Sequence, residues 1–462
     1  MLFQVQSWDE ANLKTGRLAL INMIPLFMTV HQSLLADILG ISLQTCQWIH
    51  RASGWMVSSL VALHVLVALS IQQNLSLKRQ ENVFAIVGAA TLGTIMIFSI
   101  PIFRKHVYEL FLRTHQGLAA VSFYAIWKHI PSDSAFPRLY LYVPLAILGS
   151  TTLYQCGKLL YQNGFMSSRP NPRAMVICKK AEPNKTNKEL AKQGDSENVE
   201  QVVKMTVTLG RPLEIRAGQY IQLWMPSVSF SSWLQSHPFV VTSWSPGKQD
   251  TLELFVQVRR GFTSRIYKHA SPSGSASFSA LVTGPFGLSY AVDQYETVLV
   301  IASGFGIAGV VPYIKQLLYG YNTSTARIRR VHLLWETKTL DLVREAQPLL
   351  NSLLTDDILD NGYILEMSFY VESTEDDKRS FGKHNRAFLY KGKPSYDQII
   401  SAEASGDYIE RVSNTQEEIG DMLVLACVSD GLRDDLRKIV REYLDKKVEM
   451  REVEYQPVEI VA

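Results

Sequence analysis

The sequence predicts a multidomain membrane protein: a bundle of transmembrane α-helices over residues 1–165, a small antiparallel β-barrel over 170–290 and an α/β domain over 295–462. Three observations predict this class. Long apolar runs in the first third approach the roughly 20 residues that a helix needs to cross a bilayer. Short strand-like runs punctuated by Gly and Pro follow them. From residue 297 an apolar strand then leads into a glycine-rich turn and a helical stretch, which is typical of a βαβ unit.

The composition of the 462-residue chain excludes several other classes. Lys and Arg number 46 against 43 Asp and Glu, and no basic stripe carries interleaved aromatics, so nucleic acid is not an expected partner. The four cysteines are scattered without a CxxC pair, which argues against zinc or an iron–sulfur cluster. Charged residues are sparse over 18–157 and ordinary over 170–462, so we expect the first part in lipid and the second in water.

Five transmembrane helices are expected, over residues 18–40, 47–71, 82–103, 106–130 and 139–158. Each except the fourth contains a long window without charged residues. Charges that include Glu109 and Lys128 interrupt the fourth, which would also suit a buried or interfacial helix. We favour a span, because charged side chains near a helix end can reach the lipid headgroups.

The loops predict an orientation. Basic residues cluster after the last expected span, which places residues 170–462 in the cytosol. Five spans then put the N-terminus outside although no signal peptide precedes the first apolar run, so we expect a further helix upstream of this chain. Residues 181–200 and 372–420 are polar and are expected to be insertions in the barrel and in the α/β domain.

Four histidines recur at one spacing on two expected helices. His50 and His64 lie 14 residues apart, and so do His115 and His129. Fourteen residues return a helix to within about 40° of the same face after a rise of about 21 Å. Each helix thus presents one histidine near each membrane surface. The two helices run in the same direction, so His50 should pair with His115 and His64 with His129.

The paired histidines predict two haem sites. Haem iron takes two axial ligands, and a histidine inside a membrane is costly without a partner. Two haems stacked along the bilayer normal would form an electron path, with the inner haem at His50 and His115 and the outer haem at His64 and His129. Isolated polar residues packed between helices are the alternative, and the matched spacing favours haem.

Two glycine motifs indicate nucleotide binding. The segment from Ser303 to Gly309 contains GxGxxG after an apolar strand, where glycines let the backbone approach a pyrophosphate and the next helix supplies N–H groups. The segment Gly284-Pro285-Phe286-Gly287 is a tight turn before the βαβ unit, and a plain domain junction would also explain it.

Together these features resemble the ferric reductase and NADPH oxidase family, in particular the fungal ferric-chelate (metallo)reductases. The double histidine spacing is the membrane signature of that family, and the segment from His237 to Val240 resembles its HPFT flavin motif. The resemblance implies a ferredoxin-reductase-like soluble part with an FAD-binding barrel and an NADPH-binding α/β domain. The implied FAD-binding residues are Tyr220, His237, Pro238, Phe239, Val240, Thr242, Ser243, Arg259 and Thr263. The implied NADP-binding residues are Gly284, Pro285, Phe286, Gly287, Ser303, Gly304, Phe305, Gly306, Gly309, Cys427 and Ser429, with Cys427 near the nicotinamide.

The resemblance also implies an activity. Cytosolic NADPH would reduce FAD, and single electrons would pass two b-type haems to extracytoplasmic Fe(III) or Cu(II) chelates, for metal uptake. The plasma membrane is the implied location, with vacuolar or other endomembranes as alternatives, and a metal permease or oxidase would act downstream. A superoxide-generating NADPH oxidase is the alternative function, which the short outer loops 72–82 and 131–138 disfavour.

Several positions depart from the family pattern. Val240 replaces the Thr of HPFT, and Val428 with Ser429 replaces the Gly-Pro that follows the family's cysteine. Many members end on an aromatic residue that covers the flavin, and Tyr455 is the nearest candidate here. These departures and the missing helix motivate a second alternative, a non-catalytic or truncated membrane haem protein.

The choice between NADH and NADPH stays open from the residues alone. Glu336 follows the second strand of the βαβ unit and could hold a ribose hydroxyl of NADH. The residues that could instead accommodate a 2′-phosphate are Thr337, Lys338, Arg327, Arg329 and Arg330. The family favours NADPH.

Overall fold

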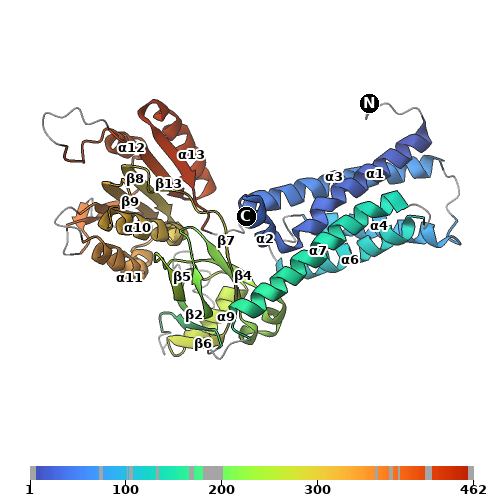
Figure 1. Ribbon diagram of the computed structural model, residues 1–462, viewed down its shortest axis with the longest axis horizontal. Helices are drawn as coiled ribbons and strands as arrows, with labels where there is room; N and C mark the ends of the chain where they lie inside the picture. Colours follow the sequence, from blue (N-terminus) through green and yellow to red (C-terminus); the bar gives the residue numbers. More distant parts are fainter. Residues whose placement is uncertain are drawn as a thin grey trace. The chain divides into compact units, whose positions relative to one another are not determined.

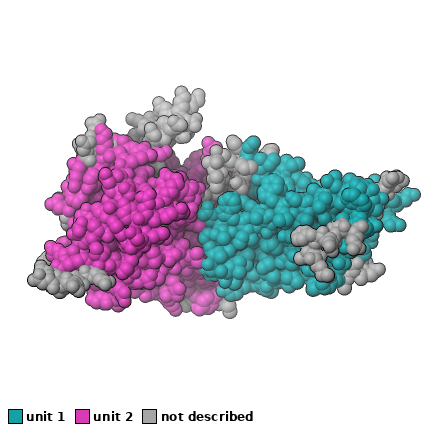
Figure 2. Space-filling model, turned by 90° about the horizontal axis from the view of Figure 1, so that it is seen from above, with its two compact units in different colours: residues 1–157, 458–462 teal, residues 158–457 magenta. Residues whose placement is uncertain are grey.

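The computed structural model describes residues 7–71, 76–100, 102, 108–131, 135–165, 171–180, 201–358, 363–373, 378–382, 385–411 and 419–455. It divides into two compact units, the first holding Met1–Gly157 and the second Lys158–Pro457. Figure 1 traces the chain through both, and Figure 2 colours the first teal and the second magenta.

The first unit is a bundle of helices. Their bounds are α1 Trp8–Met28, α2 Gln32–Leu39, α3 Leu43–Ile71, α4 Gln80–Phe98, α6 Tyr108–His129 and α7 Ala135–Gln162, the last of which continues into the second unit. Three segments of the described chain are long and apolar enough to cross a membrane. They are Trp8–Leu39, Leu43–Ile71 and Gln80–Phe98, with mean hydropathies of 1.5, 2.0 and 1.6. The fourth and fifth expected spans are helical, as α6 and α7, but are not among these three.

The first helix does not follow the expected span 18–40. It begins at Trp8, where the Ser7 side chain accepts a hydrogen bond from the Glu10 N–H at 3.2 Å and acidic residues occupy the first turn. A 3₁₀ turn over Thr29–His31 then separates α1 from α2. Hydropathy locates the apolar part of a helix, whereas caps and backbone hydrogen bonds decide where the helix begins and ends.

The bundle buries little of its apolar surface. Helix α1 packs along α3 and α4 along α6, and a small apolar core formed by Leu20, Met23, Val57, Ile130 and Leu141 joins α1, α3, α7 and the end of α6. Large side chains stay exposed elsewhere, for example Leu66 at 63% and Leu153 at 75%. A helix in water carries a polar outer face, so this apolar exterior is typical of contact with lipid.

The second unit begins with the predicted antiparallel barrel. Its two sheets have the strand orders β5-β2-β1-β6 and β4-β3-β7. The bounds are β1 Arg173–Ile177, β2 Val202–Glu214, β3 Tyr220–Trp224, β4 His237–Val240, β5 Lys248–Gln257, β6 Ser275–Ser279 and β7 Leu281–Phe286. Both sheets and helix α9, Phe262–Ala270, enclose one apolar core that includes Met205, Leu223 and Ile266. The expected insertion 181–200 lies outside the described residues.

The α/β domain is built on a seven-stranded sheet with the order β11-β12-β10-β9-β8-β13-β14. The strands are β8 Thr297–Ser303, β9 Arg330–Thr337, β10 Leu365–Val371, β11 Lys378–Ser380, β12 Ala387–Lys391, β13 Met422–Cys427 and β14 Val448–Glu452. The helices are α10 Ile307–Asn322, α11 Leu340–Asp356, α12 Tyr396–Ala404 and α13 Asp430–Arg441. Strands β8 and β9 pair in parallel, and α10 connects them along the chain, which confirms the predicted βαβ unit. The strand order reverses between β8 and β13, and ligands of such sheets bind at this kind of switch point.

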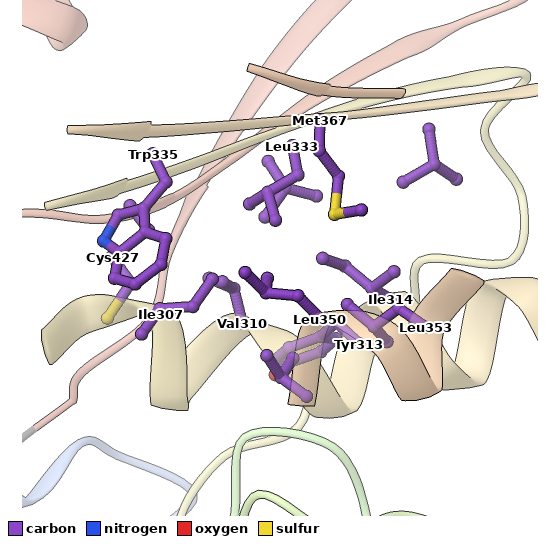
Figure 3. Packing of buried hydrophobic residues seen from close by; sticks show 14 of the residues in the cluster. Ile307, Val310, Tyr313, Ile314, Leu333, Trp335, Leu350, Leu353, Met367 and Cys427 are labelled. Atoms are coloured by element: carbon purple, nitrogen blue, oxygen red, sulfur yellow. The ribbon is translucent and has the colours of Figure 1, made fainter. Parts of the chain in front are cut away.

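Helices cover both faces of this sheet. Figure 3 shows the face under α10 and α11, where Leu333, Trp335 and Met367 from the strands meet Val310 and Leu350 from the helices. Helices α12 and α13 cover the other face. Burial on both faces explains the nearly continuous apolar sequences of β8 and β13.

Residues 372–420 are not a simple insertion, contrary to expectation. Strand β12 continues the sheet by pairing in parallel with β10, and α12 buries Ile400 in the core. Leu389 of β12 is fully buried as well. The segment has a polar composition because a strand near the sheet edge and a short surface helix each bury only part of their side chains.

Candidate functional site

Two histidine pairs lie between helices α3 and α6. The ring centroids of His50 and His115 are 6.1 Å apart, and those of His64 and His129 are 6.4 Å apart. The structure therefore brings together the residues that the sequence matched by spacing. Along each helix the two histidines are separated by about 21 Å.

Three of the four imidazoles are held through Nδ1. The contacts are His50 with the Thr29 hydroxyl at 2.7 Å, His64 with the Asn12 carbonyl at 2.9 Å and His129 with the Glu81 carbonyl at 3.2 Å. Such a contact fixes the orientation of the ring and leaves Nε2 for a metal. The buried Nδ1 of His115 makes no hydrogen bond to the described part of the chain.

Gly16 of helix α1 leaves the space that the His64 ring occupies. A Cβ atom at Gly16 would lie 3.2 Å from Cε1 and 3.3 Å from Nδ1 of His64. A residue larger than glycine would therefore press on the ring that the Asn12 carbonyl of the same helix orients.

The histidine pairs fit two haem irons. Metal–imidazole bonds of about 2 Å place two rings that ligate one metal from opposite sides with their centroids about 6 Å apart. Both observed separations agree with this value. A haem of the b type takes two such imidazoles, so the donor set suits the group that the sequence predicts.

A pocket in the second unit adjoins the strand with the flavin motif. It is lined by Pro238, Phe239, Val240, Phe255, Val256, Gln257, Arg259, Thr263 and Tyr455. This set includes five residues that the resemblance implies for FAD: Pro238, Phe239, Val240, Arg259 and Thr263. Strand β4 and the segment that leads into α9 therefore form one surface.

The start of α9 has the geometry of an anion site. Gly261 precedes the helix with a φ of 84°, and the Arg259 N–H donates to the Thr263 hydroxyl at 2.7 Å. The Arg259 side chain is held by Gln257 at 2.9 Å. The N–H groups of a first helical turn beside a guanidinium suit a pyrophosphate.

His237 is a neutral, half-buried ring. It stacks on Phe262 with centroids 4.1 Å apart. Burial, aided by the Arg265 charge, lowers the pKa of His237 to about 4. Its buried Nε2 makes no hydrogen bond to the described residues, which leaves a polar atom for a ligand to satisfy.

The other residues implied for FAD contact the barrel itself. The Thr242 hydroxyl donates to the Glu253 carbonyl at 2.9 Å, and the Ser243 hydroxyl accepts from the Glu253 N–H at 3.1 Å. The Tyr220 ring lies 6.0 Å from that of Phe286. These three residues are not among those that line the pocket.

The glycine-rich turn adjoins the end of β13. A Cβ atom at Gly306 would collide with the Cys427 carbonyl, and one at Gly309 would lie 3.0 Å from the Cys427 sulfur. The Ser429 N–H donates to the Ser303 hydroxyl at 3.0 Å, which joins the loops after β8 and β13. The first turn of α10 is thereby positioned at the switch point, where its N–H groups can bind a pyrophosphate.

The turn Gly284–Gly287 contacts the end of α7 within the second unit. Asn163 pairs with the backbone of Val282 through two hydrogen bonds of 2.7 and 2.8 Å, and Gln162 donates to the Gly284 carbonyl. A Cβ atom at Gly287 would lie 3.0 Å from the Tyr220 ring. These contacts give the turn a structural role beside the nucleotide contact that the resemblance implies.

Tyr455 links the pocket to the glycine-rich turn. Its ring stacks on Phe305 with centroids 6.0 Å apart, and its hydroxyl accepts from the Gln257 N–H at 3.3 Å. From the sequence, Tyr455 is identified only as the nearest terminal aromatic, and nothing indicates that Phe255 and Gln257 line the pocket. The sequence pattern predicts a strand at β5, but it does not predict which side chains of that strand face the pocket.

Glu336 lies at the carboxyl end of β9, in register with Ser303 of β8. Its carboxylate accepts a hydrogen bond of 2.6 Å from the Tyr396 hydroxyl. The second strand of a dinucleotide-binding βαβ unit ends where the adenosine ribose binds.

The arginines expected at this position lie at the other end of the strand. Arg330 begins β9 and binds the Glu403 carboxylate at 2.6 Å, and Arg329 pairs with Glu296 at 3.4 Å. Six strand residues, about 20 Å, separate Arg330 from Glu336. Arg329 and Arg330 therefore stabilise the domain and do not reach the ribose position, contrary to expectation.

Comparison with known families agrees with this arrangement. Three family models match in chain order: "Ferric reductase like transmembrane component" over residues 15–126, "FAD-binding domain" over 189–290 and "Ferric reductase NAD binding domain" over 295–441. Fold and site thus define a membrane helix bundle joined to a flavin- and nicotinamide-binding reductase module. The chain belongs to the ferric reductase family.

Individual relatives are more distant. Ferric/cupric reductase transmembrane component 2 of Saccharomyces cerevisiae is 26% identical over 392 residues, 81% of this chain and 50% of that protein. Ferric reduction oxidase 5 of Arabidopsis thaliana is 26% identical over 62% of this chain and 36% of that protein. The chain spans half or less of the length of these curated relatives. Among solved structures, a flavohemoglobin from Malassezia yamatoensis with bound FAD and heme matches 97% of this chain and 99% of its own at 12% identity, with a TM-score of 0.39.

Proposed function

We propose that this chain is an NADPH-dependent ferric-chelate reductase of the plasma membrane. It carries electrons from cytosolic NADPH through FAD and two b-type haems to Fe(III) or Cu(II) chelates outside, for metal uptake. The observation that carries the proposal is the pair of histidine sites, with ring separations of 6.1 and 6.4 Å. The names of its relatives support ferric and cupric substrates. A metal permease or oxidase would act downstream on the reduced metal.

In the membrane, His50 and His115 would hold the inner haem, and His64 and His129 the outer one. FAD and haem, when bound, convert the two electrons of a hydride into single-electron steps. The Thr29 hydroxyl orients one of these imidazoles through Nδ1, and backbone carbonyls orient two others.

In the soluble part, Arg259 and the first turn of α9 would bind the FAD pyrophosphate, and the segment Pro238–Val240 would contact the flavin. Val240 supplies no hydroxyl, so its side chain would make only apolar contacts with the flavin. Tyr455 would cover this pocket from the side of the glycine-rich turn. The N–H groups at the start of α10 would bind the NADPH pyrophosphate, with Cys427 near the nicotinamide.

Anaerobic haem spectroscopy on membranes that contain the full chain tests the proposal. We expect NADPH to reduce the haem and a ferric chelate to reoxidise it. Rapid reoxidation by air but not by the chelate would instead identify a superoxide-generating oxidase. Bound haem that NADPH never reduces would contradict the electron path.

A further inference from the structure

One hydrogen bond lies at the end of β9, where the ribose whose 2′ group distinguishes NADH from NADPH would bind. The Tyr396 hydroxyl donates to a carboxylate oxygen of Glu336 at 2.6 Å. Tyr396 is the first residue of α12, and its ring packs in the apolar cluster on the α12 face of the sheet. Glu336 itself is half-buried at the carboxyl end of β9, beside the last residue of β8.

A free carboxylate here would select against NADPH. An acidic side chain at the end of the second strand accepts a hydrogen bond from the 2′-hydroxyl of NADH, and its charge repels the 2′-phosphate of NADPH. Arg329 and Arg330 cannot offset that charge, because they are bound to carboxylates at the opposite end of β9. Lys338, exposed two residues after Glu336, is the basic residue that follows the strand most closely.

We propose that Tyr396 determines the dinucleotide preference by holding the Glu336 carboxylate against α12, so that the chain accepts a 2′-phosphate beside Lys338. This inference rests on the proposed function, because it names the specificity element of the same nucleotide site. The hydroxyl occupies a lone pair of the carboxylate that would otherwise accept from a ribose. Without that hydroxyl, Glu336 is free to turn towards the ribose.

Calorimetric binding of NADP⁺ and NAD⁺ to the purified full chain tests the inference without a need for turnover. We expect Tyr396→Phe to lower the ratio of NADP⁺ affinity to NAD⁺ affinity about tenfold, which corresponds to about 1.4 kcal/mol. Glu336→Gln should raise the same ratio. The double variant should behave like Glu336→Gln, because the tyrosine acts only through the carboxylate.

Tyr443→Phe is the matched control. The Tyr443 hydroxyl donates to Asp397 at 2.8 Å, so this variant also removes a tyrosine–carboxylate bond to α12, one residue away, and leaves Glu336 untouched. We expect no change in the affinity ratio. An equal change in both tyrosine variants would assign the effect to loosening of α12 and overturn the inference.

The remaining outcomes distinguish failure of the proposed function from failure of the role of Tyr396. Failure of the unaltered chain to bind either nucleotide would contradict the proposed function. An unchanged ratio in Tyr396→Phe would contradict the role of Tyr396 and leave the proposed function standing. Binding of NAD⁺ alone by the unaltered chain would contradict both the role of Tyr396 and the NADPH dependence in the proposed function.

Discussion

At the residue scale, Gly306 shows how a missing side chain permits an approach between two segments. The turn before α10 passes so close to the end of β13 that a Cβ atom would meet the Cys427 carbonyl. Backbone cannot move aside as a flexible side chain can. We therefore expect Gly306→Ala to destabilise the second unit by about 2–3 kcal/mol and to weaken NADP⁺ binding.

Thermal unfolding of the full chain, followed by tryptophan fluorescence, measures this effect. Gly247→Ala is the control, because a Cβ atom at Gly247 would meet nothing within 4 Å. It should leave the unfolding midpoint nearly unchanged. Equal midpoints for the two variants would show that the turn can shift away from β13.

His237 makes stability depend on pH. Its pKa falls from 6.5 to about 4 in the folded state, chiefly through burial. The folded state therefore binds fewer protons than the unfolded state between these values. Above pH 6.5 His237 is neutral in both states and does not reduce the free energy of unfolding; as the pH falls towards 4, this free energy decreases. At pH 5 the loss amounts to about 2 kcal/mol.

His237→Phe removes the titrating group and keeps a ring to stack on Phe262. The unfolding midpoint of this variant should fall less than that of the unaltered chain between pH 7 and pH 5. Parallel pH profiles of the two proteins would contradict a buried neutral imidazole at this position.

At the scale of elements, Asn163 fastens the end of α7 to strand β7. Its side-chain amide bonds both the N–H and the carbonyl of Val282, as a neighbouring strand would, and both residues are buried. Asn163→Ala leaves both backbone groups without their partner. We expect a loss of about 2–4 kcal/mol of stability in thermal unfolding.

A second asparagine provides the comparison. Asn322 donates to the Asp356 carbonyl from a half-buried position, so water can replace the lost bond in Asn322→Ala. This variant should lower the free energy of unfolding by less than about 1 kcal/mol. If Asn163→Ala costs no more, the end of α7 is held by its other contacts.

At the scale of the whole molecule, the two histidine pairs predict a haem count. Under the proposed ligand set, His115→Ala should reduce the haem content from two per chain to one, and His115→Ala with His64→Ala should abolish it, because each site would keep only one of its two proposed ligands. The ratio of extracted haem to protein measures this without any electron donor.

His31→Ala is the control for this count. His31 lies in the same bundle but contacts Thr152 at 2.9 Å, outside both pairs. It should retain two haems per chain. Loss of haem in this variant alone, with the paired histidines dispensable, would contradict the proposed ligands.

The sequence by itself determined the fold class and the histidine pairing. Apolar length, strand alternation and a 14-residue recurrence are periodic properties of single elements, and helix geometry converts them directly into faces and directions. The same holds for the βαβ unit, whose strand, glycine turn and helix are contiguous in the chain.

Only the tertiary structure decided which polar groups stay available for ligands. Thr242 and Ser243 bind the Glu253 backbone. Tyr455 follows the last strand, β14, and lines the pocket. Tyr396 meets Glu336 across 60 residues of sequence. A hydrogen bond depends on distances of a few tenths of an ångström between segments that the packed core brings together, and no local pattern in the sequence encodes those distances.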